Sequence, residues 1–312
     1  MPLPAQVWIV EVGLRDGLQL AGQVVPVEAK LRLLRALHAT GLRAMEVTSF
    51  VSPAAVPQFA DAETVARAAV ALPDLRVSAL IPNLRGQVRA HAVGIRHVTF
   101  VVAATDAFNV ENVRMPVEES LAHLAPIVQA QRAVPEASVE VGIAVAFGCP
   151  YTGPVPFEAI RKIVDRAVAL GVGGIALGDT IGVATPEQVY LAASRLRDAY
   201  PNLPLGLHLH DTRGLGLANV LAGMEAGVTT FDASVGGMGG CPAAPGATGN
   251  IATETLNQAL QERGFVTHID QGALLDCARL VHELITPDLP SRAPSGQPSP
   301  ASLPGPRPGP AA

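Results

Sequence analysis

The stretch LGLHLHDTRGLGLANVLAGMEAGVTTFDASVGGMGGCPAAPGATGNIAT, residues 205–253, decides the fold and carries most of the candidate chemistry. It opens with a short apolar segment, Leu205–Leu209, at whose end His208 and His210 lie two positions apart. In a strand, side chains at i and i+2 point to the same face, so both imidazoles leave the backbone together. A run of helical length, a second apolar segment (Val228–Val235) and a glycine-rich loop follow, which is the alternation of a parallel α/β sheet.

The same alternation extends outward from this stretch, from the start of the chain to about residue 263. The apolar runs of strand length are Val7–Val12, Arg43–Thr48, Arg76–Ile81, His97–Ala103, Val139–Ala146, Gly174–Leu177, Leu205–Leu209 and Thr230–Val235. Eight strands alternating with helices predict a parallel sheet. Closure into one (β/α)8 (TIM) barrel accounts for the count and leaves no edge strand.

Helix signals fill the segments between these strands. Thr185–Gln188 is a capping box with proline at the first helical position, so a helix is expected to start there. We expect Asn250–Leu260 to be the eighth helix of the barrel and Asp270–Leu284 to be an additional C-terminal helix packed outside it.

The composition fits one large domain followed by a tail. Hydrophobic residues make up 49% and aromatic residues 4% of the 312 positions, which favours an aliphatic core of the kind found in helix-covered parallel sheets. Residues 287–312 are rich in Pro, Ser, Gly and Ala and have little to bury, so we expect a disordered tail. The barrel domain is therefore expected to span residues 1–286.

Charge and patterning exclude several classes of partner. The net charge is -5 and there is no basic run, which disfavours a nucleic-acid surface. No apolar stretch approaches the roughly 20 residues needed to cross a bilayer, and the first residues lack the pattern of a signal peptide. We therefore expect a cytoplasmic protein without a membrane partner. Its three cysteines, odd in number and widely spaced, fit reduced thiols.

Four residues suggest a metal centre. In a (β/α)8 barrel, functional groups gather at the carboxyl ends of the strands. Asp16 follows the first strand, His208 and His210 end the seventh, and Asn250 is expected at the start of the eighth helix. One carboxylate, two imidazoles and one amide oxygen favour an octahedral Mg²⁺ or Mn²⁺ over zinc. The alternative is a pair of interior histidines satisfied by hydrogen bonds.

Charged residues near these positions are candidates for positioning the metal ligands. Arg15 precedes Asp16, and the two form either a solvated turn pair or part of the barrel mouth. Glu46 and Asp179 are carboxylates set into apolar strand ends, where an isolated charge would be costly. We expect them to pair with Arg15 or to orient metal-binding histidines, although Asp179 is equally suited to capping a helix.

The cysteines differ in their surroundings. Cys241 lies in a glycine-rich loop, where a thiol above a cationic site can have a lowered pKa and exchange protons. Cys149 also follows a strand end and is the competing candidate. Cys277 has helical spacing with Leu274 and Leu280, which is typical of the core.

Several longer motifs resemble the family of 3-hydroxy-3-methylglutaryl-CoA (HMG-CoA) lyases, metal-dependent TIM-barrel enzymes related to Claisen-type synthases. The motifs are EVGLRDGLQ (11–19), EVTSFVSPAAVPQFAD (46–61), FGCPYTG (147–153), LGDTIGVATP (177–186), HLHDTRGLGLANVLAGMEAGV (208–228) and SVGGMGGCPAAPGATGNIATE (234–254). They cover nearly the whole barrel. The GGCP loop is the part specific to lyases, because the condensing synthases have a different glycine loop there.

The resemblance implies roles for individual residues. It implies that Asp16, His208, His210 and Asn250 bind the divalent cation. Arg15 would stabilise enolate charge, Cys241 would take part in acid/base chemistry, and His208 is the better candidate for carrying a proton at the metal. Glu46, Asp179 and Glu254 are expected to support these residues without binding the cation. The residues that hold coenzyme A are not identified by any motif.

The implied reaction is a retro-Claisen (retro-aldol) cleavage of HMG-CoA to acetyl-CoA and acetoacetate, with a homodimer as the implied assembly. The chain departs from the family pattern at Leu20–Gly22, Ala103–Asp106 and Ala243. A different 3-hydroxy-3-methyl-branched acyl-CoA is therefore an alternative substrate. A Claisen-condensing acyltransferase and a non-catalytic binding barrel are the competing functions.

Overall fold

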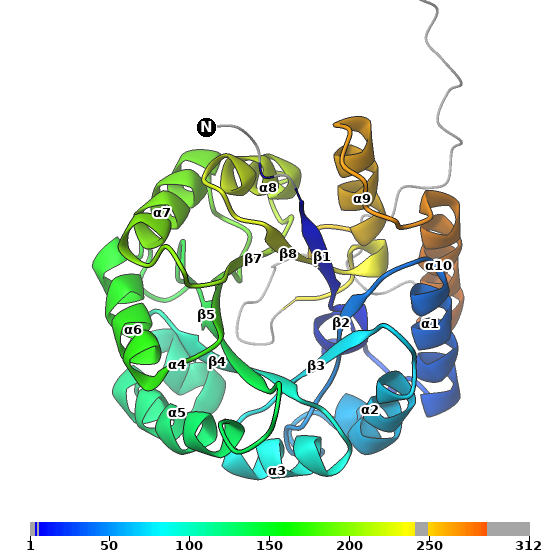
Figure 1. The fold of residues 1–312 in the computed structure, drawn as a ribbon, viewed down its shortest axis with the longest axis horizontal. Helices are drawn as coiled ribbons and strands as arrows, with labels where there is room; N and C mark the ends of the chain where they lie inside the picture. Colours follow the sequence, from blue (N-terminus) through cyan, green and yellow to red (C-terminus); the bar gives the residue numbers. More distant parts are fainter. Residues whose placement is uncertain (1–3, 5, 241–248, 286–312) are drawn as a thin grey trace, which may run out of the picture.

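The structure is a computed structural model that describes residues 4, 6–240 and 249–285. Eight strands form a closed barrel in chain order, and every neighbouring pair is parallel, including β8 with β1 (Figure 1). They are β1 (Trp8–Glu11), β2 (Ala44–Ser49), β3 (Arg76–Leu80), β4 (His97–Ala103), β5 (Ser138–Ala144), β6 (Gly174–Asp179), β7 (Leu205–Leu209) and β8 (Thr230–Ala233). The (β/α)8 barrel expected from the sequence is confirmed.

A ring of helices surrounds the barrel in Figure 1. The α-helices are α1 (Val27–Ala39), α2 (Ala62–Val70), α3 (Leu84–Ala92), α4 (Asp106–Val113), α5 (Val117–Gln131), α6 (Phe157–Leu170), α7 (Pro186–Ala199), α8 (Gly216–Glu225), α9 (Thr253–Glu262) and α10 (Gln271–Leu284). The short turns η1 (Gly13–Gly17), η2 (Pro57–Phe59) and η3 (Val235–Gly237) lie between them. The capping box at the start of α7 forms as expected: Thr185 accepts from the backbone of Gln188, and the Gln188 side chain reaches back.

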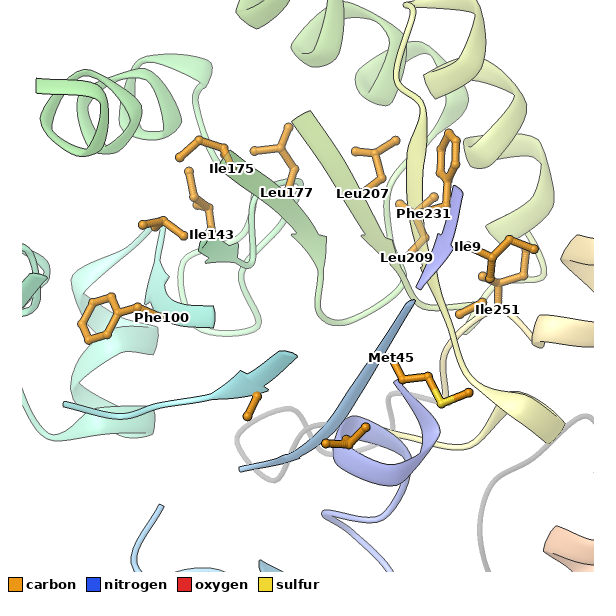
Figure 2. Close-up of a cluster of buried hydrophobic side chains, with 14 of the residues drawn as sticks. Ile9, Met45, Phe100, Ile143, Ile175, Leu177, Leu207, Leu209, Phe231 and Ile251 are labelled. Atoms are coloured by element: carbon orange, nitrogen blue, oxygen red, sulfur yellow. The ribbon is translucent and has the colours of Figure 1, made fainter. Parts of the chain in front are cut away.

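Large apolar side chains occupy the space between the strands and the helices. Ile175, Leu177 and Leu207 point from β6 and β7 toward the surrounding helices (Figure 2), and all three are almost fully buried. Burying such a side chain contributes roughly 1.5–3 kcal/mol. This layer, made of aliphatic residues and few aromatic ones, holds the barrel closed.

The inner face of the barrel is built differently. Small residues such as Ala44, Gly142, Ala176 and Gly206 line a cavity of about 1290 Å³ that also reaches the mouth residues Arg15 and Asp16. Most barrels of this class fill their interior with layers of bulky branched side chains. Here the small side chains leave room for polar groups beneath the mouth.

The additional C-terminal helix is confirmed. Helix α10 packs beside α1 on the outside of the barrel (Figure 1), and Asp270 caps its first turn by accepting from the backbone N–H of Ala273 at 2.9 Å. The backbone N–H of Asp270 donates to the carbonyl of Thr40 at 2.7 Å. The expected tail, residues 287–312, lies outside the described residues.

The expected start of the eighth helix is wrong by three residues. Helix α9 begins at Thr253, because the backbone before it pairs with the sheet: Asn250 bridges to His210 and Ala252 bridges to Ser234. Asn250 therefore lies in an extended segment beside β7. Within the described residues, no helix combines the length and the apolar character needed to cross a bilayer.

Candidate active site

A single buried turn of π-helix, η1, carries Arg15 and Asp16 directly after β1. The Glu11 carboxylate holds this turn, accepting from the backbone N–H groups of Gly13 (2.7 Å) and Val235 (3.0 Å) and from the Thr253 hydroxyl (2.6 Å). A Cβ on Gly13 would lie 2.5 Å from Glu11 Oε1, so a larger residue there would displace this carboxylate. Burial raises the pKa of Glu11 to about 7 despite these donors.

The carboxyl ends of β1 and β7 bring the expected metal ligands together. The Nε2 atoms of His208 and His210 lie 3.3 Å apart, and Asp16 Oδ2 lies 3.9 Å from the first and 3.7 Å from the second. One ligand atom from each of the three residues falls within 4.8 Å of the others. The predicted convergence of residues 16, 208 and 210 is therefore present in the structure.

Asn250 completes the set through its bridge to β7. Its Nδ2 donates to Asp16 Oδ2 (2.7 Å) and to the carbonyl of Met238 (3.0 Å). Its Oδ1 is buried and has no hydrogen-bond donor among the described residues. Gly239, with a positive φ of 129°, passes so close that a Cβ there would lie 2.7 Å from Asp16 Oδ2. The loop backbone and the amide thus close one side of the site.

The donor set fits a divalent cation. Burial alone would raise the pKa of Asp16, but His210, Arg15 and His208 outweigh it and hold this pKa well below its usual range. The two Nε2 atoms, 3.3 Å apart, share a hydrogen bond when one of them carries a proton, and both can turn a lone pair to one cation when neither does. An ionised carboxylate, two imidazoles and an orphaned amide oxygen supply the mixed N/O ligands that such a cation takes.

Arg15 is anchored on two carboxylates. Its Nη1 donates to Asp16, and its Nε lies 2.8 Å from Glu46 Oε2. Burial raises the pKa of Glu46, and the Arg15 charge opposes that rise. Glu46 thus contacts Arg15, which is one of the two arrangements expected from the sequence, and the guanidinium lines the cavity beside the candidate metal ligands.

Asp179 and Glu254 accept hydrogen bonds from the backbone of neighbouring loops. The Asp179 carboxylate accepts from the N–H groups of Val183 (2.9 Å) and Ala184 (3.1 Å), which fixes the turn after β6. Glu254 Oε2 accepts from the N–H of Gly236 at 3.1 Å. Burial raises the pKa of both carboxyls. Each shapes a loop at the mouth.

Sequence reasoning missed two residues of the site. Gln19 Nε2 donates to Asp16 Oδ1 (2.8 Å) and to the carbonyl of Gly240 (2.6 Å), so it joins η1 to the glycine-rich loop. Asp232, in β8, lies with Oδ2 at 2.9 Å from His208 Nδ1. The signal for Asp232 was present in the sequence: an acidic residue interrupts an apolar strand, as at Glu46.

The described cysteines take different places. Cys149 is a buried thiol beside Thr105 Oγ1 (3.2 Å). Burial would raise the Cys149 pKa, but hydrogen bonds from Thr105 and Thr152 lower it below its usual value. Burial raises the pKa of Cys277 to about 12, which fits the core position expected for it in α10. Cys241 lies outside the described residues.

The barrel and its donor set define the class: a (β/α)8 enzyme with a candidate divalent-cation centre at the carboxyl ends of its strands. The chain belongs to the HMGL-like family, whose model matches residues 6–281. The resemblance seen in the motifs is thereby confirmed.

Relatives of known name share nearly the full length of the chain. A hydroxymethylglutaryl-CoA lyase of Bacillus subtilis (strain 168) is 37% identical, covering 94% of this chain and 97% of its own length. The mitochondrial hydroxymethylglutaryl-CoA lyase of Gallus gallus is 39% identical, covering 89% and 93%. A solved HMG-CoA lyase of Acinetobacter baumannii, in complex with coenzyme A and 3-methylmalate, superposes with a TM-score of 0.90 at 37% identity, covering 97% of this chain and 99% of its own.

Proposed function

We propose that the protein is a divalent-cation-dependent carbon–carbon lyase that cleaves HMG-CoA to acetyl-CoA and acetoacetate by a retro-Claisen step. The convergence of Asp16, His208, His210 and Asn250 at the mouth of the barrel carries the proposal. Full-length identity of 37–39% to relatives named for this activity supports the choice of substrate.

Mg²⁺ or Mn²⁺ is the cation we propose, held by Asp16 Oδ2, the Nε2 atoms of His208 and His210, and Asn250 Oδ1. When bound, such a cation lowers the cost of removing a proton from a substrate hydroxyl. Arg15 and Asp16 are adjacent in the same buried turn, so the guanidinium lies next to one of the residues that would hold the cation.

The residues of the chain account for the proton and the electron pair. His208 Nε2 accepts the C3 hydroxyl proton, and the electrons of the C2–C3 bond pass to the acetyl-CoA enolate as acetoacetate forms. Arg15 donates to the enolate oxygen, where charge develops. Cys241 returns a proton to the enolate carbon; this assignment rests on the resemblance alone.

The two roles proposed for His208 use one lone pair. Nδ1 lies against Asp232, so both cation binding and proton acceptance fall to Nε2. A lone pair that holds a cation cannot accept a proton, so His208 would serve as the base only while its Nε2 is not bound to the cation. Glu46, Asp179 and Glu254 support the site by holding Arg15 and the mouth loops in place.

One assay tests the proposal. Purified protein with HMG-CoA should release acetoacetate in the presence of Mg²⁺ or Mn²⁺ and stop releasing it with EDTA. Condensation of acetyl-CoA with a keto acid would favour the acyltransferase alternative. Absence of both activities, together with no bound cation, would favour a binding barrel.

The proposal also covers the acyl group of the substrate, the oligomeric state and the cellular compartment. The departures at Leu20–Gly22 and Ala103–Asp106 make a panel of 3-hydroxy-3-methyl acyl-CoAs the test of substrate choice. Light scattering during size-exclusion chromatography tests the homodimer that the resemblance implies. Cell fractionation tests the cytoplasmic location.

A further inference from the structure

Asp232 lies on the inner face of the barrel, beside the candidate metal ligand His208. Its strand position pairs with His208 in the register between β7 and β8, and its side chain lines the cavity. The next residue back, Phe231, points to the opposite face and is fully buried in the layer between strand and helices (Figure 2). An acidic side chain on the inner face of β8 is thus placed beside one particular imidazole.

The contact between the two side chains is specific. Asp232 Oδ2 lies 2.9 Å from His208 Nδ1, and the histidine supplies the one hydrogen-bond donor that Asp232 contacts among the described residues. His208 Nε2 points the other way, toward His210 Nε2 at 3.3 Å and Asp16 Oδ2 at 3.9 Å. One ring nitrogen therefore faces a carboxylate and the other faces the proposed cation.

An ionised carboxylate can only accept hydrogen bonds, so Nδ1 of a neutral His208 must carry the ring proton. The lone pair then lies on Nε2. His210 has no comparable partner: its Nδ1 is buried without a hydrogen bond to any residue that the structure describes. The two histidines of the motif are alike in sequence and different in what fixes their tautomer.

We propose that Asp232 is the positioning residue of the site, which holds His208 in the Nδ1–H tautomer and so presents the Nε2 lone pair to the cation or to the substrate hydroxyl. The inference rests on the proposed function, because both roles of His208 there need that lone pair. Carboxylates that orient metal-binding histidines in this way typically change metal affinity by roughly 10–100-fold when they are replaced.

Asp232→Asn tests the inference. An amide can donate to Nδ1 as well as accept from it, so the variant no longer enforces one tautomer. The tautomer is read by ¹⁵N NMR on protein labelled in its 8 histidines, in alkaline buffer where the rings are neutral. The His208 signals are assigned by their loss in His208→Gln. Titration of the apoprotein with Mn²⁺ gives the second readout.

Glu140→Gln is the matched control. It makes the same change of carboxyl to amide in the same cavity, on β5, without a hydrogen bond to either histidine. Burial, with Asp232 and Glu46 nearby, raises the pKa of Glu140 to about 8. In the alkaline buffer of the NMR measurement this carboxyl is ionised, so Glu140→Gln removes one negative charge from the cavity, as Asp232→Asn does.

The inference expects His208 to be in the Nδ1–H form in the wild-type protein and in Glu140→Gln. In Asp232→Asn, Nε2–H signals should appear, and Mn²⁺ should bind at least about 10-fold more weakly. A switched tautomer with unchanged Mn²⁺ affinity would overturn the part of the inference that concerns the cation. An Nε2–H signal assigned to His208 in the wild-type protein would overturn it, even if the variant failed to fold.

A retained Nδ1–H form in folded Asp232→Asn would also overturn the inference. The proposed function fails separately: a wild-type protein that binds no Mn²⁺ and cleaves no HMG-CoA contradicts the lyase assignment, whatever the tautomer of His208. The tautomer measurement uses apoprotein and does not depend on that outcome.

Discussion

Replacing Arg15 with glutamine should lower the rate of catalysis while leaving the stability of the fold almost unchanged. The guanidinium is fixed by Asp16 through Nη1 and by Glu46 through Nε at 2.8 Å, and its remaining exposed surface faces the cavity. Arg15→Gln removes the positive charge and keeps a polar side chain of intermediate length. The fold around η1 keeps its other anchor, the Glu11 carboxylate.

Two effects with different magnitudes follow from this change. The enolate oxygen loses a preorganised donor, an effect worth about 2.7–4 kcal/mol, or about 10²–10³-fold in kcat. Glu46 loses its counterion, but burial already raises the pKa of that carboxyl, so it takes up a proton instead of remaining as a bare buried charge. Arg15→Gln should therefore lower kcat strongly and lower the free energy of unfolding only slightly.

The assay is the steady-state release of acetoacetate at saturating HMG-CoA, with thermal unfolding measured on the same samples. Arg15→Gln/Glu46→Gln is the control, since it pairs two neutral amides. We expect the double variant to recover thermal stability and to keep the loss in kcat. A kcat within about fivefold of wild type for Arg15→Gln would refute the role in charge stabilisation. Recovery of rate in the double variant would refute it equally.

Further changes test other parts of the site. Cys241→Ala should lower turnover far more than Cys149→Ala, and equal effects would remove Cys241 from the mechanism. Gly13→Ala forces a Cβ against Glu11 and should cost about 1–3 kcal/mol of stability and weaken Mn²⁺ binding, whereas Gly22→Ala, in open space, should do neither. Burial raises the pKa of Glu140, so the folded protein holds the Glu140 proton more tightly than the unfolded chain does. The free energy of unfolding that this proton contributes is present below about pH 4.5 and is lost as the pH rises toward 8. In denaturant unfolding, Glu140→Gln should be at least about 1 kcal/mol more stable than wild type at pH 8 and no more stable at pH 4.5. Free energies of unfolding that change with pH in parallel for the two proteins would contradict this.

The sequence predicts the barrel well because its strands are marked by composition. Runs such as His97–Ala103 and Leu205–Leu209 have the observed bounds, and the other strands differ by one or two residues at their ends. Buried parallel strands read as apolar runs, whatever their neighbours. The metal ligands were predictable for a related reason: the carboxyl ends of the strands in this fold face the mouth.

The sequence could not predict the contacts that depend on how the strands are aligned with one another. Asn250 was placed in a helix, because the propensity of residues 250–260 says nothing of its backbone bridge to His210. The pairing of Asp232 with His208 likewise depends on how β7 and β8 are staggered. Gln19 finds the carbonyl of Gly240 across more than 200 residues of chain. Each of these contacts is a property of the closed barrel.

The division between the two faces of the strands explains how the chain supports a polar site without losing its core. On the outer face, Ile175, Leu177 and Phe231 supply the apolar burial that holds helices to strands. On the inner face, small residues such as Gly142 and Gly206 leave a cavity in which carboxyl groups lie beneath the histidines. Because alternate residues of one strand serve the two faces, substitutions on the inner face can change tautomers and pKa values while the outer layer is untouched. This separation is the reason why rate, cation affinity and stability should respond independently in the variants described above.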